Sequence, residues 1–222
     1  MAFEYKKVLI LGATSGIGKS LATRFVKENS KNGRDKVDTI VFDITKLDQI
    51  SSFLSDIFTK HPDNDCVFVN PGIQRPFDFS NPGTVDLPTF DEELLVNYTS
   101  AVHFSKALLP YLQKQQNQTT IAFTSQMALV PMMRCPGYGA SKAALHHFIL
   151  ALRTQLNNGP GDIRVIEIYP PAVQTELHDT KHQPDLKDGH LIGMPVEEFV
   201  ESVWQQLVEG EDQIAVGSAR DV

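Results

Sequence analysis

Residues 124–152 read TSQMALVPMMRCPGYGASKAALHHFILAL. The end of an apolar strand, 120–124, is followed by a loop rich in Pro and Gly and then by a long helix. Tyr138 and Lys142 are four residues apart on that helix, so they share one face and lie one turn apart. Ser125 directly follows the strand, at the edge of the sheet where α/β proteins bind ligands. A phenol, an ammonium and a hydroxyl gathered there can trade a proton with an alcohol or carbonyl oxygen.

A Tyr and a Lys at this spacing also occur on many surface helices, but the Ser placed 13 residues upstream favours a site. The positive charge of Lys142 favours the phenolate, so we expect the pKa of Tyr138 to fall from its usual value of about 10. The segment resembles the short-chain dehydrogenase/reductase family, whose signature is a Ser followed by Tyr-x-x-x-Lys. The resemblance implies that Tyr138 is the general acid/base, that Lys142 is its electrostatic partner and that Ser125 orients the substrate's carbonyl oxygen.

Length and composition exclude several other classes of protein. The 222 residues suit one α/β domain over 1–222. A net charge of −7 without a Lys/Arg run argues against a nucleic-acid partner, and no apolar run reaches the length of a membrane span. The first residues lead directly into a strand rather than a signal peptide, and two cysteines indicate no disulfide framework. We therefore expect a cytoplasmic protein whose partner is a small-molecule substrate.

A glycine-rich turn follows the first strand. Strand 7–11 (KVLIL) leads into GATSGIG at 12–18, and a helical pattern begins there. Gly12 permits the tight turn, Gly16 lets backbone amides approach a pyrophosphate, and Gly18 lets helix and strand pack closely. The helix N-terminus offers partial positive charge to phosphates. The spacing G-x-x-x-G-x-G resembles the family's form of the dinucleotide-binding turn, which implies NAD or NADP as cofactor.

The next stretch is shorter than the family pattern. Gly18 and Asp43 are only 25 residues apart, which leaves room for one helix and one strand, predicted at 37–42. The family usually has two strands and a helix in this interval, so the chain is expected to be one strand and one helix short. The missing strand is the one that reads the adenosine ribose and chooses between NAD and NADP.

Two placements of strand 37–42 are open. It could keep the family's third position and leave a gap, or it could move beside strand 7–11 by the shortest right-handed crossover. The second placement is favoured because a gap would leave unpaired strand edges. It would bring Asp43 to the ribose, where its charge would repel a 2′-phosphate, so NAD would be preferred and binding could be weak or lost.

The resemblance also implies catalytic or cofactor-binding roles for further residues. Asn70-Pro71-Gly72 follows strand 65–69 and is similar to the family's Asn-Ala-Gly, and Asn97 in helix 91–112 matches the Asn that holds a water beside Lys142. Residues 170–175 (PPAVQT) resemble Pro-Gly-x-Val-x-Thr, which contacts the nicotinamide. The implied catalytic residues are Ser125, Tyr138, Lys142 and Asn97; the implied cofactor-binding residues are Gly12, Thr14, Ser15, Gly16, Ile17, Gly18, Asp43, Ile44, Asn70, Gly72, Pro170, Val173 and Thr175.

The expected fold is a doubly wound parallel sheet, Rossmann-like, with helices on both faces. Further helices are predicted at 48–60 and 195–209 and further strands at 164–169 and 213–216. The apolar faces of helices 91–112 and 138–157 resemble those through which the family forms dimers and tetramers, so a homodimer or homotetramer is expected. His103, His146 and His147 lie on these helices without neighbours at ligand spacing, so packing is expected for them and no metal site.

Two functions follow from this interpretation. The first is an NAD(P)-dependent oxidoreductase that interconverts an alcohol and a carbonyl on a small organic substrate. The alternative is an enzyme of the same fold that has lost or weakened dinucleotide binding and catalyses redox-neutral chemistry (an isomerase, dehydratase or cyclase), or an inactive relative. The retained Ser, Tyr, Lys and Asn favour an enzyme over an inactive relative, and the shortened adenosine side favours the redox-neutral chemistry.

Overall fold

The computed structural model describes residues 5–30, 36–125, 130–180 and 183–221. Within them, five parallel strands form one sheet in the order β1-β2-β3-β4-β5. The strands are β1 (Val8–Leu11), β2 (Cys66–Val69), β3 (Thr119–Thr124), β4 (Ile163–Tyr169) and β5 (Gln213–Ala215). The central strands β2 and β3 are buried along their whole length, as expected for parallel strands covered on both faces.

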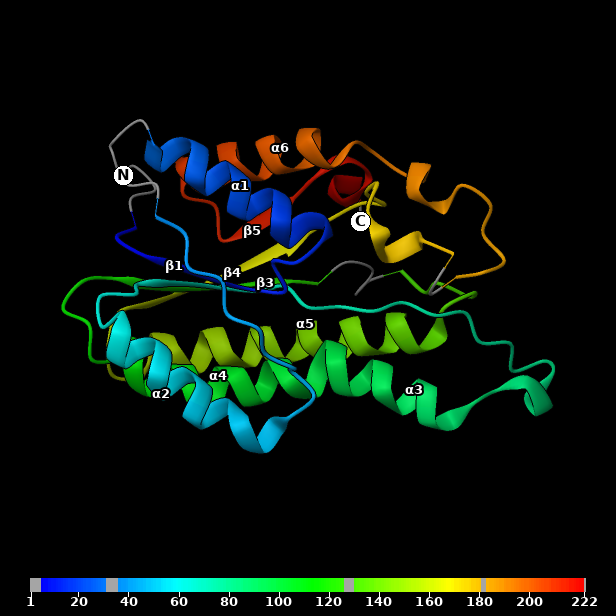
Figure 1. Ribbon diagram of the computed structural model, residues 1–222, viewed down its shortest axis with the longest axis horizontal. Coiled ribbons are helices and arrows are strands. Elements are labelled where there is room, and N and C mark those ends of the chain that lie inside the picture. The colour runs from blue at the N-terminus through cyan, green and yellow to red at the C-terminus, as the bar shows by residue number, and fades with distance from the viewer. Residues whose placement is uncertain (1–4, 31–35, 126–129, 181–182, 222) are drawn as a thin grey trace.

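Helices cover both faces of the sheet, which confirms the Rossmann-like fold (Figure 1). One face packs against α1 (Gly16–Ser30) and α6 (Val196–Glu209), and the other against α2 (Ile50–Lys60), α4 (Ser100–Leu112) and α5 (Pro136–Asn157). Side chains alternate between the two faces along each strand. In β3, for example, Ile121 and Phe123 join the core under α2, α4 and α5, whereas Ala122 joins the core under α1 and α6.

The predicted helix 91–112 is divided in the structure. α3 (Leu87–Leu94) begins at Asp86, whose carboxylate accepts a hydrogen bond from the Thr89 backbone N–H. A π-helical turn, η3 (Leu95–Thr99), then separates α3 from α4. Such π turns are rare and frequently occur at functional sites. The shorter 3₁₀ turns are η1 (Leu47–Gln49), η2 (Pro82–Thr84), η4 (Glu176–His178), η5 (Gly189–Leu191) and η6 (Gly217–Asp221).

The predicted strand 37–42 is not formed, so both placements considered for it are wrong. Residues 36–42 have no regular secondary structure, and Val37, Ile40 and Val41 are 59%, 49% and 96% exposed. The chain instead crosses from the layer of α1 to the layer of α2 (Figure 1). Phe42 anchors this crossing, because its ring stacks on Phe53 with centroids 4.0 Å apart.

This crossing makes β1 an edge strand of the sheet. In doubly wound sheets the strand order reverses beside the first strand, and ligands bind in the crevice at that point. Here the order runs from β1 in one direction only among the described strands. Among the described residues, the sheet therefore has neither of the two strands that the resemblance implies beyond β1, whereas the sequence predicted the loss of one. The carboxyl ends of β1 to β4 can therefore form only one side of such a crevice.

The other predicted strands and helices are present, with ends that shift by a few residues. Among the described residues, no helix combines the length and the apolarity that a membrane span requires.

The anchoring role of Phe42 is testable by stability measurements. Phe42→Ala should lower the free energy of unfolding by about 2–3 kcal/mol, because it removes a ring packed on Phe53 and Phe104. Its neighbour Val41 is 96% exposed, so Val41→Ala should change that free energy by less than about 0.5 kcal/mol. Urea denaturation measures both. Equal effects of the two substitutions would contradict the anchored crossing.

Candidate active site

The glycine-rich turn brings three strands together at their carboxyl ends. A Cβ on Gly18 would lie 2.2 Å from the carbonyl oxygen of Gly12, so only glycine allows this close approach. Gly12 itself has φ +72°, a conformation that other residues rarely adopt. Asn70 donates a hydrogen bond from Nδ2 to the Gly12 carbonyl (3.3 Å) and accepts one at Oδ1 from the Thr124 hydroxyl (3.0 Å). Asn70 thus connects the ends of β1, β2 and β3.

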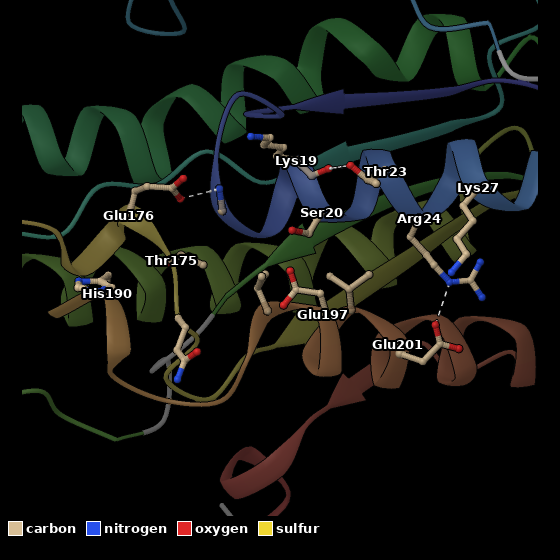
Figure 2. Close-up of a pocket in the computed structure, with 14 residues that line it drawn as sticks. Lys19, Ser20, Thr23, Arg24, Lys27, Thr175, Glu176, His190, Glu197 and Glu201 are labelled. Atoms are coloured by element: carbon tan, nitrogen blue, oxygen red, sulfur yellow. Dashed lines mark hydrogen bonds and ion pairs between the residues drawn. The ribbon is translucent and has the colours of Figure 1, made fainter. Parts of the chain in front are cut away.

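The N-terminus of α1 already holds a carboxylate. The Gly16 backbone N–H donates to Oε2 of Glu176 over 2.9 Å, as Figure 2 shows. Beside this contact, a groove of about 630 Å³ runs between α1 and α6 and is also lined by residues 174–176. Exposed helix amides and the helix dipole attract anions, so Glu176 occupies the position at which a phosphate oxygen would bind. The turn therefore fits the pyrophosphate of a dinucleotide.

Tyr138 and Lys142 lie one turn apart on α5, and both are buried. Lys142 donates from Nζ to the Thr124 carbonyl oxygen (3.0 Å), and its Nζ lies 5.6 Å from the centroid of the Tyr138 ring. Burial lowers the pKa of Lys142 to about 8. Burial likewise raises the pKa of Tyr138, and the nearby Glu93 adds to that rise. The expected fall in the Tyr138 pKa is therefore not found, because burial disfavours the charged phenolate and the nearby Glu93 disfavours it further.

Asn97 lies in the π-helical turn η3, and its side-chain amide makes hydrogen bonds to Ile73 and Ser141. Its Oδ1 accepts from the Ile73 backbone N–H (2.8 Å), and its Nδ2 donates to the Ile73 carbonyl (2.9 Å) and to the Ser141 hydroxyl (3.0 Å). A Cβ on Gly72 would meet Nζ of Lys142 at 3.5 Å and Oδ1 of Asn97 at 3.6 Å. The structure thus places Asn97 and Gly72 next to the Lys142 ammonium.

Ser125 is buried at the carboxyl end of β3, where its backbone N–H donates to the Ile168 carbonyl (3.0 Å). Its hydroxyl donates a hydrogen bond to Oε1 of Glu167 on β4, at a distance of 2.5 Å. Ser125 was predicted from the sequence and Glu167 was not, although a glutamate inside the apolar strand IRVIEIY is a visible signal. His146, expected only in packing, also contacts Glu167: its Nδ1 lies 2.9 Å from Oε1.

Asp43 makes side-chain hydrogen bonds within its own turn. Its exposed carboxylate accepts from the backbone N–H (3.0 Å) and hydroxyl (2.7 Å) of Thr45, and these hydrogen bonds lower the pKa of Asp43. Ile44 packs into the core under α2 and α4. Asp43 therefore stabilises its own turn, and among the described residues no strand connects it to the edge of the sheet at β1.

The remaining predicted residues lie in the glycine-rich turn, in the first turn of α1 and on the loop after β4. Thr14 and Ser15 are exposed in the glycine-rich turn, and Ile17 packs against the core of α1 and α6. On the loop after β4, Pro170 is buried, and Val173 forms a parallel bridge with Met194. The Thr175 hydroxyl accepts from the Leu177 N–H over 3.4 Å. Within the described segments, no three His, Cys, Asp or Glu side chains gather as metal ligands do.

Comparison with known proteins decides the family. The model of the short chain dehydrogenase family matches residues 29–185. The chain is also 31% identical to the uncharacterized oxidoreductase DltE of Bacillus subtilis, over 96% of this chain and 89% of that protein. The chain belongs to the short-chain dehydrogenase family.

Other relatives of this short-chain dehydrogenase carry more specific names. Serine 3-dehydrogenase of Agrobacterium fabrum is 32% identical over 77% of this chain and 73% of its own length. The benzil reductase IRC24 of Saccharomyces cerevisiae is 28% identical over 78% of this chain and 73% of its own. The chain spans only 58% of the length of estradiol 17-beta-dehydrogenase 2 of Rattus norvegicus, to which it is 25% identical over 92% of this chain.

Solved structures confirm the fold. A short chain dehydrogenase from Burkholderia cenocepacia in complex with NADP matches with a TM-score of 0.80 at 23% identity, over 100% of this chain and 92% of that one. A member from Burkholderia phymatum in complex with NAD matches with a TM-score of 0.81 at 17% identity, over 99% and 91%.

A second buried carboxylate of this short-chain dehydrogenase was also missed by the sequence analysis. Glu93 lies on α3, one helical turn before Asn97, and is fully buried. Burial raises its pKa to about 7, although the charge and the backbone N–H of Arg75 oppose the rise. A carboxyl with such a pKa beside Tyr138 and Lys142 changes charge near neutral pH, and so changes the field at both groups.

The raised pKa of Glu93 predicts how stability depends on pH. The unfolded chain loses this proton near its usual pKa of about 4.3, whereas the folded chain keeps it to about 7. Between these values the folded state binds more protons, so its stability falls as pH rises. Glu93→Gln should remove this fall and gain on the order of 1–2 kcal/mol over wild type between pH 5 and pH 8.

Urea denaturation at pH 5 and pH 8 measures this effect. The matched control is Glu92→Gln, because Glu92 is half exposed and pairs with Arg75 at 2.8 Å. It should keep the pH dependence of the wild type. If Glu93→Gln keeps it too, Glu93 does not titrate as described.

Proposed function

We propose that this short-chain dehydrogenase is an NAD(P)-dependent oxidoreductase that interconverts an alcohol and a carbonyl on a small organic substrate. The observation that carries the proposal is the buried cluster of Tyr138, Lys142 and Asn97 beside the carboxyl end of β3. The glycine-rich turn that fits a pyrophosphate lies at the same edge of the sheet, connected to β3 through Asn70. The relatives named as dehydrogenases and reductases agree with this reaction type.

Each residue of the cluster has a distinct task in the proposed reaction. Tyr138 gives a proton to the substrate oxygen in reduction and takes it back in oxidation. Lys142, held by the Thr124 carbonyl, stabilises the phenolate that remains. Ser125 contacts the substrate oxygen, and Asn97 holds the backbone around the water that replenishes the proton. The nicotinamide, when bound, gives or accepts the hydride.

The pyrophosphate would lie on the backbone amides of residues 15–18. The nicotinamide would lie near Val173 and Thr175, which follow β4. On the adenosine side, both strands beyond β1 are absent from the described chain and Asp43 is committed to Thr45. We therefore propose weak cofactor binding with little choice between NAD and NADP, in place of the predicted preference for NAD.

The absent strands and the carboxylate at the Gly16 amide also support the alternative function. An enzyme that had abandoned the dinucleotide could use the same Tyr and Lys for redox-neutral proton transfer. Calorimetric titration distinguishes the two functions, because only the oxidoreductase has to bind NADH or NADPH.

We further propose a cytoplasmic homodimer or homotetramer. The expected contact is the outer face of α4 and α5, where Leu150 is 38% exposed.

Tyr138→Phe should lower kcat by about 10²–10⁴-fold, because it removes the proton that Tyr138 transfers. The substrate for this measurement is the alcohol or carbonyl that a screen with both cofactors identifies. Tyr111→Phe is the matched control, because Tyr111 stacks on Phe58 (4.4 Å between centroids) away from the cluster. A folded Tyr138→Phe variant with normal turnover would refute the proposed role.

Glu176→Gln should bind NADH about 3- to 10-fold more tightly than wild type, because it removes a negative charge from the helix terminus that holds the pyrophosphate. Glu197→Gln is the control, since Glu197 lines the same groove on α6 (Figure 2). Asp43→Ala should leave binding unchanged within about twofold, as expected for an exposed surface position. Titration calorimetry gives the dissociation constants. Equal NADH affinities of wild type and Glu176→Gln would show that the Glu176 carboxylate does not compete with the pyrophosphate.

A further inference from the structure

A buried carboxylate that the proposed reaction does not use lies directly under α5. Glu167 is fully buried in β4, where it pairs in register with Phe123 of β3. Alternation along β4 turns Glu167 to the same face as Ile163 and Val165, which pack into the core under α5. A buried charge is costly unless it is paired and hydrogen-bonded, so its partners show what it does.

Three polar groups contact the Glu167 carboxylate. The Ser125 hydroxyl donates to Oε1 over 2.5 Å, and the Tyr169 hydroxyl donates to Oε2 over 2.6 Å. His146 Nδ1 lies 2.9 Å from Oε1, and its side chain is 13% exposed. An ionised carboxylate accepts all three hydrogen bonds at once, whereas a protonated one would have to donate one of them.

The arrangement fixes the direction of the Ser125 hydroxyl. Because the carboxylate accepts, the Ser125 proton points to Glu167 and the lone pairs of the Ser125 oxygen stay available to other groups. Charge-assisted hydrogen bonds to a carboxylate are about twice as strong as neutral ones, so the hydroxyl does not rotate freely. His146 at the same oxygen and Tyr169 at Oε2 limit the movement of the carboxylate.

This network continues the row of catalytic side chains on α5. Tyr138, Lys142 and His146 follow one another at intervals of four residues and share a helix face. The network therefore spans β3, β4 and α5 and connects the proposed catalytic Ser125 to His146. Among the described residues, Arg153 of α5 is a further charged group near the network. Its Nε donates to the Val165 carbonyl (3.3 Å), and its charge lowers the pKa of Tyr169, which burial and Glu167 raise.

We propose that Glu167, held by His146 and Tyr169, is the positioning residue that orients the Ser125 hydroxyl for the reaction. The inference rests on the proposed function for the role of Ser125, whereas the hydrogen bonds themselves are independent of it. Glu167 acts through Ser125, so its removal should matter only while Ser125 is present.

A double-mutant cycle tests the kinetic part of this inference. Benzil with NADPH is the probe, because a yeast relative is named as a benzil reductase. Glu167→Gln should lower kcat about tenfold with little change in KM, because a misdirected hydroxyl no longer fits the reacting geometry. In a Ser125→Ala background the same change should have less than about a twofold effect. A tenfold loss in both backgrounds would overturn the positioning role and leave Glu167 a purely structural residue.

Nitrogen chemical shifts of the His146 ring give a second test that needs no substrate. Ser125→Ala should shift the His146 Nδ1 signal, because Ser125 and His146 share Oε1 of Glu167. The matched control is Ser105→Ala: this buried Ser donates to the Ala101 carbonyl (2.7 Å), outside the network, and the signal should not move.

The two tests separate failure of this inference from failure of the proposed function. If benzil is not turned over but the His146 signal responds to Ser125→Ala alone, the hydrogen-bonded network stands and only the proposed substrate fails. If the signal ignores Ser125→Ala, the network is refuted whatever the kinetics show. If Glu167→Gln does not fold, His146→Asn replaces it in the kinetic cycle, because His146 contacts the same carboxylate from a partly exposed position.

Discussion

The chain between α1 and α2 has to pass from one face of the sheet to the other, and the packing of Phe42 determines where it passes. Phe42 and Ile44 enter the core under α2 and α4, so the preceding residues are drawn past the sheet and cannot extend it beside β1. A strand at this position would gain backbone hydrogen bonds, but it would have to give up the burial of the Phe42 ring. Burying such a side chain contributes up to roughly 1.5–3 kcal/mol, which is comparable with two or three net hydrogen bonds of about 1 kcal/mol each. The open edge of the sheet and the reduced adenosine side both follow from this crossing.

The face of the sheet under α5 carries an unusual number of buried polar groups. Lys142, Asn97, Ser125 and Glu167 are all buried there, and each has hydrogen-bond partners in the described chain. Apolar residues of similar size would be cheaper to bury, so these groups are not explained by stability alone. Their partners are mostly backbone carbonyls and side chains at the carboxyl ends of strands, which hold them in one geometry. The burial that fixes the geometry also alters the acid–base behaviour, since it lowers the pKa of Lys142 to about 8 and raises that of Tyr138.

The charge of Glu176 at the glycine-rich turn bears on how an anion binds there. The N-terminus of α1 attracts an anion, and the chain supplies one of its own in Glu176. A phosphate must displace this carboxylate, so the affinity for a dinucleotide reflects the difference between two anions at one site. Together with the absence of strands beyond β1 in the described chain, this competition is the basis for the weak binding proposed above. The membership in the short-chain dehydrogenase family establishes the architecture, and the local charges decide how strongly it holds its cofactor.

Local patterns in the sequence determined the features that depend on neighbouring residues. The spacing of Tyr138 and Lys142 places them on one helix face, and the glycines at 12, 16 and 18 permit only one kind of turn, so both were predictable. The run 37–42 has the apolar residues of a strand, but whether a short apolar run pairs or packs depends on the core that it meets. The pKa of Tyr138 was predicted with the wrong sign because burial, unlike spacing, is a property of the whole fold. Of the three partners of Glu167, Tyr169 is two residues away on β4, but Ser125 and His146 are 42 and 21 residues away in the chain, and only the packing of α5 on the sheet brings these two to the carboxylate.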